Sequence, residues 1–394
     1  MAMAPENRRE LICLALAVLI PAIFFLLLPW NPANVTRQSM DHFFGADVWR
    51  VYLNLAGSDE VTHYRDKVHP YFSLFAVTVA QAGKILGIEG GEFLAYRTIF
   101  GTAGMFLFWL FVRRLTSPIN AFAAMALLLS TMTVRIWSIL PESFLFGFFT
   151  LMLGLNLAQI RFCPAATFIV TLAGTTTNCT LGIMHLLQRW RSLDWKRMTF
   201  TIAIAVLLLS SLQKSLYPSS VHFFDVFALR EEGRYVNHAA ARVPFRAFDF
   251  LYSGFVLPLP EGIIAGKITT EKLWADFAAA YETGYDNRQT LTIIAALVAI
   301  TAYLLASIVQ FARSIKPFET STLVAGFILL EFVLHLSYGN DPFLYSYHFV
   351  PFLIIFMALY LPGEKVRPFL ITLLAICLQE ANFGQWERFQ QLFA

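Results

Sequence analysis

Long apolar runs alternate with shorter polar segments along the whole chain. A helix of about 20 apolar residues is long enough to cross the roughly 30 Å hydrocarbon core of a bilayer. The pattern therefore predicts an all-α fold, a polytopic transmembrane helical bundle with about ten membrane segments. The apolar runs are 11–30, 93–112, 119–134, 143–160, 165–187, 200–212, 291–312, 321–338, 349–361 and 369–378.

Basic residues indicate how these runs are oriented. Arg8 and Arg9 precede the first run, and Arg113 and Arg114 follow the second. Because Lys and Arg favour the cytoplasmic side, we expect the short segment 71–86 to re-enter from the outer side without crossing. The run 165–187 has basic residues at both ends and GTTTN in its middle, which predicts a broken hairpin whose polar backbone lines a protein cavity.

This orientation places the polar segments on one outer face, which is the main indication of where a functional site lies. These segments are 41–70, 136–142, 175–178, 214–290 and 338–348.

The same boundaries divide the chain into three parts. Residues 1–213 form an N-terminal membrane module that includes the first outside loop, 31–70. Residues 214–290 form a large outside loop, expected to be ordered with short helices, and residues 291–394 form the C-terminal membrane segments.

The first outside loop contains an amphipathic pattern. Asp47, Arg50 and Asn54 share its polar face, and we expect this helix to lie on the membrane surface with Asp47 facing a cleft. A carboxylate held there could act as a general base toward a hydroxyl. The alternative is a surface ion pair between Asp47 and Arg50. The apolar face, expected to contact the lipid interface, contains Phe44, Val48, Val51, Tyr52 and Leu55.

Composition excludes several classes of protein. Of the 394 residues, 57% are hydrophobic and 14% charged, the mean hydropathy is +0.61 and the net charge is +3. We therefore expect membrane lipid, and no nucleic acid, as a partner. The phosphate-binding, dinucleotide-binding, serine-hydrolase and zinc-protease motifs are all missing from the sequence, which argues against a nucleotide-driven cytosolic enzyme.

A second group of polar residues in the same loop could bind a divalent metal ion. None of their spacings matches a known ligand signature. A solvated loop explains them better than a metal site does, so we predict no metal and no other cofactor. The residues are Asp59, Glu60, His63, Asp66 and His69.

Further candidates lie in the other outer segments. Lys214, at a membrane edge, could hold a phosphate group. Asp341, Tyr345 and His348 lie in one short loop and could line a site for a sugar or a lipid head group. Glu142 follows Pro141 at the start of an apolar run, where the helix dipole alone explains an acid.

Glu331 and His335 are four residues apart inside an apolar run. Ionisable residues within a membrane are costly and usually face an interior or a cavity. A mutual hydrogen bond explains them most simply, whereas the coupling path of a lipid or small-solute transporter is the alternative. Unequal outer loops and the lack of matching halves argue against a transporter. A non-catalytic scaffold would leave the polar face around Asp47 without a role.

Several short motifs occur in a characteristic order. FFGADVWRVYLNLA follows the first apolar run, His69-Pro70 precedes YFSL, and LGIEGGEFLAYRTIFGTAG contains Arg97. FLYSYHFVPF comes near the C-terminus. This layout resembles the membrane-embedded glycosyltransferases of the GT-C fold class, in particular the bacterial enzymes that use polyprenyl-phosphate sugars. Two departures are a single Asp47 where some members have paired acids, and no separate soluble domain after the last run.

The resemblance implies an activity and a set of site residues. We expect sugar transfer, with inversion, from a polyprenyl-phosphate donor to an envelope glycan, such as lipopolysaccharide, or to a lipid. The resemblance gives Asp47 the role of base, and it implies a location in the bacterial inner membrane with the site on the periplasmic side. The expected substrate-binding residues are His69, Arg97, Lys214, Asp341, Tyr345 and His348.

Overall fold

The computed structural model consists of helices joined by turns. In the part of the chain that it describes, the extended pairings are isolated bridges, Phe43 with Ile268 and Val236 with Tyr338. The prediction of an all-α fold is confirmed for that part. The described residues are 5–32, 35, 43–57, 63–160, 163–225, 230, 236, 242–258, 268–282, 287–315, 319–338 and 341–393.

Among these residues, six helices are long and apolar enough to cross a membrane. They support the prediction of a membrane protein, although their number is smaller than the ten segments that hydropathy suggested. The six are α1 (Pro5–Leu27), α4 (Gly91–Leu115), α10 (Trp195–Leu216), α14 (Asn287–Ser314), α15 (Thr320–Ser337) and α16 (Ser346–Tyr360), the last preceded by the 3₁₀ turn η9 (Pro342–Tyr345).

The run 369–378 lies within the longer helix α17 (Arg367–Phe393), and the structure also has shorter apolar helices. They are the unit Ser73–Gly83, which joins the π-helix η4 (Ser73–Val77) to α3 (Thr78–Gly83), and the helices α5 (Pro118–Leu129), α7 (Phe144–Gln159) and α8 (Pro164–Gly174).

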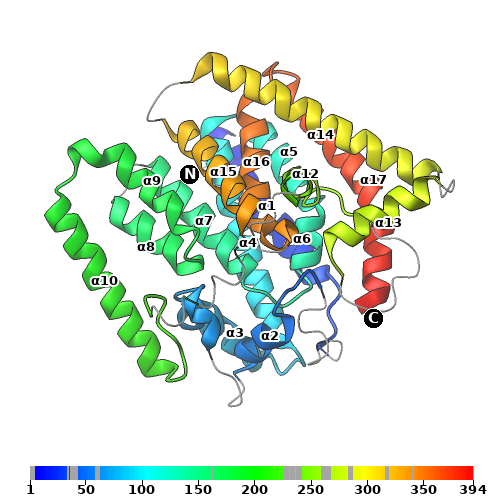
Figure 1. The fold of residues 1–394 in the computed structure, drawn as a ribbon. Helices are drawn as coiled ribbons and strands as arrows, with labels where there is room; N and C mark the ends of the chain where they lie inside the picture. The colour runs from blue at the N-terminus through cyan, green and yellow to red at the C-terminus, as the bar shows by residue number, and fades with distance from the viewer. Residues whose placement is uncertain are drawn as a thin grey trace.

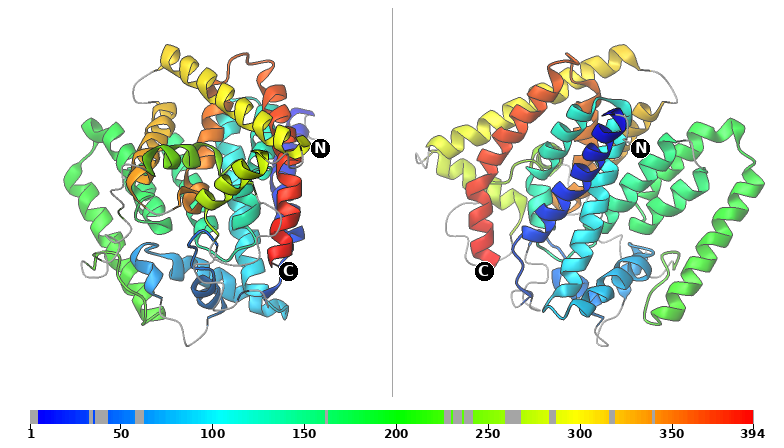
Figure 2. Two further views of the ribbon diagram at one scale, coloured as in Figure 1. Left: turned by 45° about the vertical axis from the view of Figure 1, so that its right-hand side comes forward. Right: turned by 180° about the vertical axis from the view of Figure 1, so that it is seen from behind.

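Helix α16 lies at the centre of the bundle and α10 at its edge. Of the apolar window of each helix, 78% is buried in α16 but only 11% in α10. Figure 1 shows α10 standing apart on the left while α14 and α17 (Arg367–Phe393) cover the right-hand side. The opposite view in Figure 2 shows α1 lying along α4. The protein interior is therefore built around α4, α7 and α16.

Two predicted runs have different ends in the structure. Residues 119–134 form α5 and then α6 (Met132–Trp137), because the chain breaks at Ser130 and Thr131. Helix α17 continues beyond residue 378, through polar residues that hydropathy excludes. The amide of Asn382 explains this, since its Nδ2 donates to the carbonyls of Ser130 (2.9 Å) and Phe255 (2.7 Å).

The predicted hairpin in residues 165–187 is indeed broken. Helix α8 ends at Gly174 and α9 (Cys179–Arg189) begins after the turn, and the two helices pack against each other. Thr175 Oγ1 accepts hydrogen bonds from the backbone N–H groups of Thr177 and Asn178, each 3.1 Å away. A threonine hydroxyl thus satisfies backbone groups that the break leaves unpaired.

The first amphipathic helix differs from its prediction. Helix α2 (Val48–Ala56) begins after Asp47, and Phe44 precedes it with φ +56°. Its apolar face packs on α4, α3 and η4, so that Val48 and Val51 are fully buried inside the protein. The expectation of lipid contact is wrong, because residues 63–115 cover this face.

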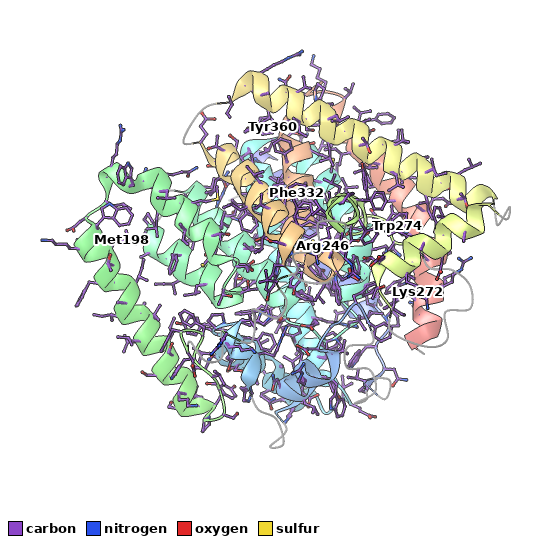
Figure 3. All side chains as sticks on the ribbon, in the orientation of Figure 1. Met198, Arg246, Lys272, Trp274, Phe332 and Tyr360 are labelled. Carbon is purple, nitrogen blue, oxygen red and sulfur yellow. The ribbon has the colours of Figure 1, made fainter. Side chains whose placement is uncertain are left out.

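Two short helices lie in the large outer segment, as predicted. These are α12 (Val243–Tyr252) and α13 (Thr270–Glu282). Arg246 of α12 donates from Nη1 to the carbonyl of Leu336, 2.9 Å away, near the end of α15. Its position between α12 and α15 is labelled in Figure 3. Because the last carbonyls of a helix have no partner within it, this contact fastens α12 to α15.

Arg97 has a similar role at the end of α1. Its side chain is buried in α4, and its guanidinium donates to the carbonyls of Leu28 (2.5 Å) and Pro29 (3.4 Å). These contacts join α4 to the chain just after α1. Arg97 therefore caps a helix end, and the expectation that it binds substrate is not supported by its position.

We expect Arg97→Met to lower the free energy of unfolding by about 2 kcal/mol, since the buried carbonyls of Leu28 and Pro29 would lose a charged donor. Thermal unfolding in detergent would measure this. Arg113→Met on the same helix is the matched control, because Arg113 makes only an exposed ion pair with Glu10 (3.2 Å), worth less than about 1 kcal/mol. Equal losses in the two variants would contradict a clamping role for Arg97.

Candidate functional site

The polar segments converge on a cavity of about 220 Å³. Every residue that lines it belongs to one of the five segments that the sequence placed on a single face. The lining residues are Phe44, Gly45, Asp47, Arg65, Val68, His69, Glu142, Thr175, Thr176, Thr177, Thr269, Tyr338, Asp341, Leu344, Tyr345 and His348.

Asp47 occupies the charged end of this cavity. It lies immediately before α2, and only 6% of the residue is exposed. Its carboxylate pairs with Arg50, as the simpler interpretation expected, and also with Arg65, whose Nη1 lies 2.7 Å from Asp47 Oδ2. Arg65 comes from the 3₁₀ helix η3 (Tyr64–Lys67). The site therefore combines a buried carboxylate with a cation that sequence reasoning did not single out.

Glu142 is a second acid at this end. Its Oε1 accepts from the backbone N–H of Asp47 at 2.6 Å, and its Oε2 accepts from that of Ser143 at 2.9 Å. Burial raises the pKa of Glu142; the charge of Arg65 opposes this rise, and that of Asp47 adds to it. The helix dipole led sequence reasoning to dismiss Glu142. Its place in one of the polar outer segments was the signal that could have identified it.

His69 connects the charged end to the hairpin break. Its Nδ1 lies 2.9 Å from the carbonyl of Gly174, so Nδ1 carries the proton and Nε2 is the acceptor. Ser143 Oγ lies 3.0 Å from Nε2, and Arg65 Nη2 lies 3.4 Å from it. Burial and the nearby Arg65 lower the pKa of His69 to about 3, which keeps the imidazole neutral. The predicted placement of His69 at the site is supported.

The hairpin break adds hydroxyl groups. Thr175, Thr176 and Thr177 all line the cavity. The backbone N–H of Thr176 donates to the carbonyl of Val68, 2.9 Å away, which holds the break against the first outer segment. The hydroxyls of Thr175 and Thr177 lie 2.6 Å apart and share a hydrogen bond. The threonines line the same cavity as the Arg65 guanidinium, and hydroxyl and guanidinium donors together suit an oxyanion.

His348 and Tyr345 also line the cavity. His348, in α16, is 1% exposed, and neither ring nitrogen has a hydrogen-bond partner. A buried polar group without a partner costs about 1–3 kcal/mol. The cavity therefore offers an unused donor and acceptor beside the aromatic ring of Tyr345, as predicted for a site that binds a polar ligand.

Asp341 also lines the cavity, but its oxygens are engaged by the protein. They accept from the backbone N–H of Thr270 (2.9 Å), from its hydroxyl (3.0 Å) and from the N–H of Phe343 (3.2 Å). Asp249 Oδ2 accepts from the same Phe343 N–H at 3.2 Å. Asp341 therefore holds the cavity wall in place, and the expectation of direct substrate binding is weakened.

Asp249 and Asp341 form a buried acid pair. Burial raises the pKa of Asp341 from 3.8 to about 6. Burial and the charge of Asp341 raise the pKa of Asp249 well above its usual value. Because two adjacent buried carboxylates cannot both ionise cheaply, the pair retains a proton near neutral pH.

Lys214 is not brought to the cavity. Its Nζ donates to the carbonyl of Ser220, 2.7 Å away, after the end of α10. The prediction that Lys214 holds a phosphate is therefore not supported, and Arg65 has the position expected for that role. The sequence contains many basic residues near the outer face, and their spacing does not reveal which one is folded inward.

The group of possible metal ligands is only partly visible. Asp59 and Glu60 lie outside the described residues. His63 and Asp66 contact Ser73 Oγ at 2.8 and 2.9 Å and do not line the cavity. Burial raises the pKa of Asp66 to about 8. In the part of the chain that can be described, no three His, Cys, Asp or Glu residues are placed to bind a metal ion.

No protein-family model, curated protein or solved structure matches this chain. The cavity itself contains a carboxylate that could accept a proton and a guanidinium with hydroxyls that could hold an anion. It also contains the unpaired imidazole of His348 and the aromatic ring of Tyr345, which suit a polar ring. These groups fit a group transfer from a phosphate leaving group to a hydroxyl.

We expect stability to fall as the pH rises from 4 to 7 because of the acid pair. The pKa of Asp341 is raised in the folded state. Its contribution to the free energy of unfolding is therefore greatest below the unfolded-state pKa and is lost as the pH rises through about 6. A rise of about two pKa units changes the free energy of unfolding by at most about 3 kcal/mol. Asp249→Asn should reduce this slope, because the pair then holds one ionisable group.

Unfolding midpoints measured between pH 4 and pH 8 would check this. Asp276→Asn, an exchange of the same kind on α13, is the control and should leave the slope unchanged. An identical slope in wild type and Asp249→Asn would show that the acid pair does not govern this pH dependence.

Proposed function

We propose that the protein is a membrane glycosyltransferase that moves a sugar from a polyprenyl-phosphate donor to a hydroxyl of an envelope glycan or lipid. The observation that supports this best is the convergence of Asp47, Arg65 and His69 with the polar hairpin break in one cavity beside apolar helices. A polyprenyl chain requires lipid, whereas its sugar phosphate requires charged and hydroxyl groups. We place the site on the periplasmic side of a bacterial inner membrane, because the orientation rule favours the outer side for these segments and the resemblance implies that membrane.

Arg65 and the threonines Thr175–Thr177 would bind the phosphate. In the structure Arg65 pairs with Asp47. A phosphate could accept two parallel hydrogen bonds from the same guanidinium. Binding of the donor would therefore draw Arg65 away from Asp47 and leave the carboxylate oxygens able to accept a proton.

Asp47 would act as the general base. The acceptor oxygen attacks the anomeric carbon while its proton passes to Asp47. The bond from that carbon to the phosphate oxygen breaks, and its electron pair leaves on the phosphate, whose charge Arg65 meets. A single displacement of this kind inverts the anomeric configuration. Glu142 would fix the base in place through the Asp47 backbone N–H.

Tyr345 and His348 would contact the sugar. The cavity, of about 220 Å³, has room for a sugar ring beside its charged groups.

Asp47→Asn should reduce sugar transfer by at least about 100-fold, because an amide cannot accept the acceptor proton. Transfer would be measured in proteoliposomes with radiolabelled polyprenyl-phosphate sugars, guided by native mass spectrometry of lipids that co-purify. Asp276→Asn is again the matched control. Full transfer by Asp47→Asn would remove the central role proposed for this residue.

Arg65→Ala should raise the KM for the donor at least about tenfold, since the phosphate would lose a charge-assisted contact. Lys214→Ala should change it by less than about twofold, because the Lys214 ammonium contacts a backbone carbonyl instead. The same proteoliposome assay compares them. A larger effect at Lys214 than at Arg65 would restore the assignment made from sequence.

A further inference from the structure

Glu331 and His335 are the ionisable residues buried within α15, and the proposed reaction does not use them. They are 1% and 2% exposed, and His335 Nε2 lies 3.1 Å from Glu331 Oε2. The mutual hydrogen bond expected from their spacing is present. Neither residue lines the cavity.

Aromatic rings surround the imidazole of His335. The ring of Tyr345 stacks on it, with centroids 4.7 Å apart and planes inclined by 23°. The rings of Phe349 and Phe250 lie 5.9 and 6.3 Å away and stack on each other at 3.9 Å. Phe332 of α15, labelled in Figure 3, packs on Phe250. These apolar surroundings suit a fixed ring better than a path for ions.

The stacked pair of His335 and Tyr345 reaches the cavity through Tyr345. Tyr345 is both the partner of His335 and a lining residue. The ring of Tyr345 lies 6.4 Å from that of His348 and 6.2 Å from that of Phe144. Because Glu331 fixes the orientation of the imidazole, it also fixes the surface on which the Tyr345 ring rests.

We propose that Glu331 and His335 are positioning residues that set the Tyr345 ring as the aromatic wall of the ligand cavity. The identity of the ligand as a sugar rests on the proposed function, whereas the placement of the ring does not. Glu331 holds His335, His335 supports Tyr345, and Tyr345 contacts the ligand. The same pair is then not the coupling path of a transporter.

The test places 3-fluorotyrosine at position 345 and records its ¹⁹F NMR signal in the purified full-length protein without substrate. His335→Ala removes the stacked ring, and its signal should move outside the wild-type line width. The double variant Glu331→Leu with His335→Phe keeps a ring and removes both ionisable groups, so its signal should return toward the wild-type position. Val333→Ala, at a residue 56% exposed on the same helix, should leave the signal unchanged.

Transfer from polyprenyl-phosphate glucose by the unlabelled variants gives an independent measurement. His335→Ala should raise the donor KM about threefold to tenfold while kcat changes less than about twofold. The double variant should restore the KM, which a path that needs ionisable groups would not allow. Should His335→Ala fail to fold, the double variant and Glu331→Gln provide the comparison.

The outcomes separate this proposal from the proposed function. A signal that moves in His335→Ala and returns in the double variant supports the positioning role, and the absence of transfer by wild type from every polyprenyl-phosphate sugar tested counts against the transferase. An unmoved signal in His335→Ala overturns the positioning role. So does a double variant whose signal matches wild type but whose transfer is lost.

Discussion

The need to satisfy polar backbone groups inside a membrane governs this structure. An unpaired N–H or C=O facing lipid costs several kcal/mol, so interruptions of apolar helices must meet partners within the protein. The break between α5 and α6 does so. The backbone N–H groups of Met132 and Thr133 donate to the carbonyls of Phe255 (3.3 Å) and Gly254 (3.0 Å), and Asn382 Nδ2 donates to the carbonyl of Ser130 (2.9 Å). At the break between α8 and α9, the backbone N–H of Thr176 donates to the carbonyl of Val68 in the first outer segment. Helix interruptions therefore gather on the interior side, and the cavity forms among them.

The acid and guanidinium groups at the cavity balance one another in charge. Asp47 and Glu142 supply acid groups, while Arg50 and Arg65 supply guanidinium groups. Ion pairs removed from water attract strongly, but they repay desolvation only with good geometry. A phosphate that replaces Asp47 as the partner of Arg65 would keep that guanidinium paired. The neutral imidazole of His69 adds a polar contact without adding charge.

Sequence reasoning located the cavity better than it assigned the residues. Hydropathy and the distribution of Lys and Arg placed the polar segments on one face, and every lining residue comes from them. Helix formation, the broken hairpin and the placement of Asp47, His69 and His348 followed from that pattern. The local sequence pattern does not show which group a side chain contacts in the fold. It therefore could not distinguish Arg65, which lines the cavity, from Lys214, which does not. It also failed for α2, because an apolar face that packs on protein resembles one that contacts lipid.

The wall formed by residues 341–348 shows why buried ionisable groups surround a site in an apolar bundle. In the proposed function this wall presents a tyrosine and a histidine to the ligand, so apolar packing alone cannot hold it. Asp341 joins it to Thr270 and Phe343, and Asp249 meets it from α12. His335 supports Tyr345 from α15. The pairs Asp249–Asp341 and Glu331–His335 are costly to bury, but they provide directional hydrogen bonds. A wall held by directional contacts at both ends keeps one shape, which selection of a single sugar ring would require.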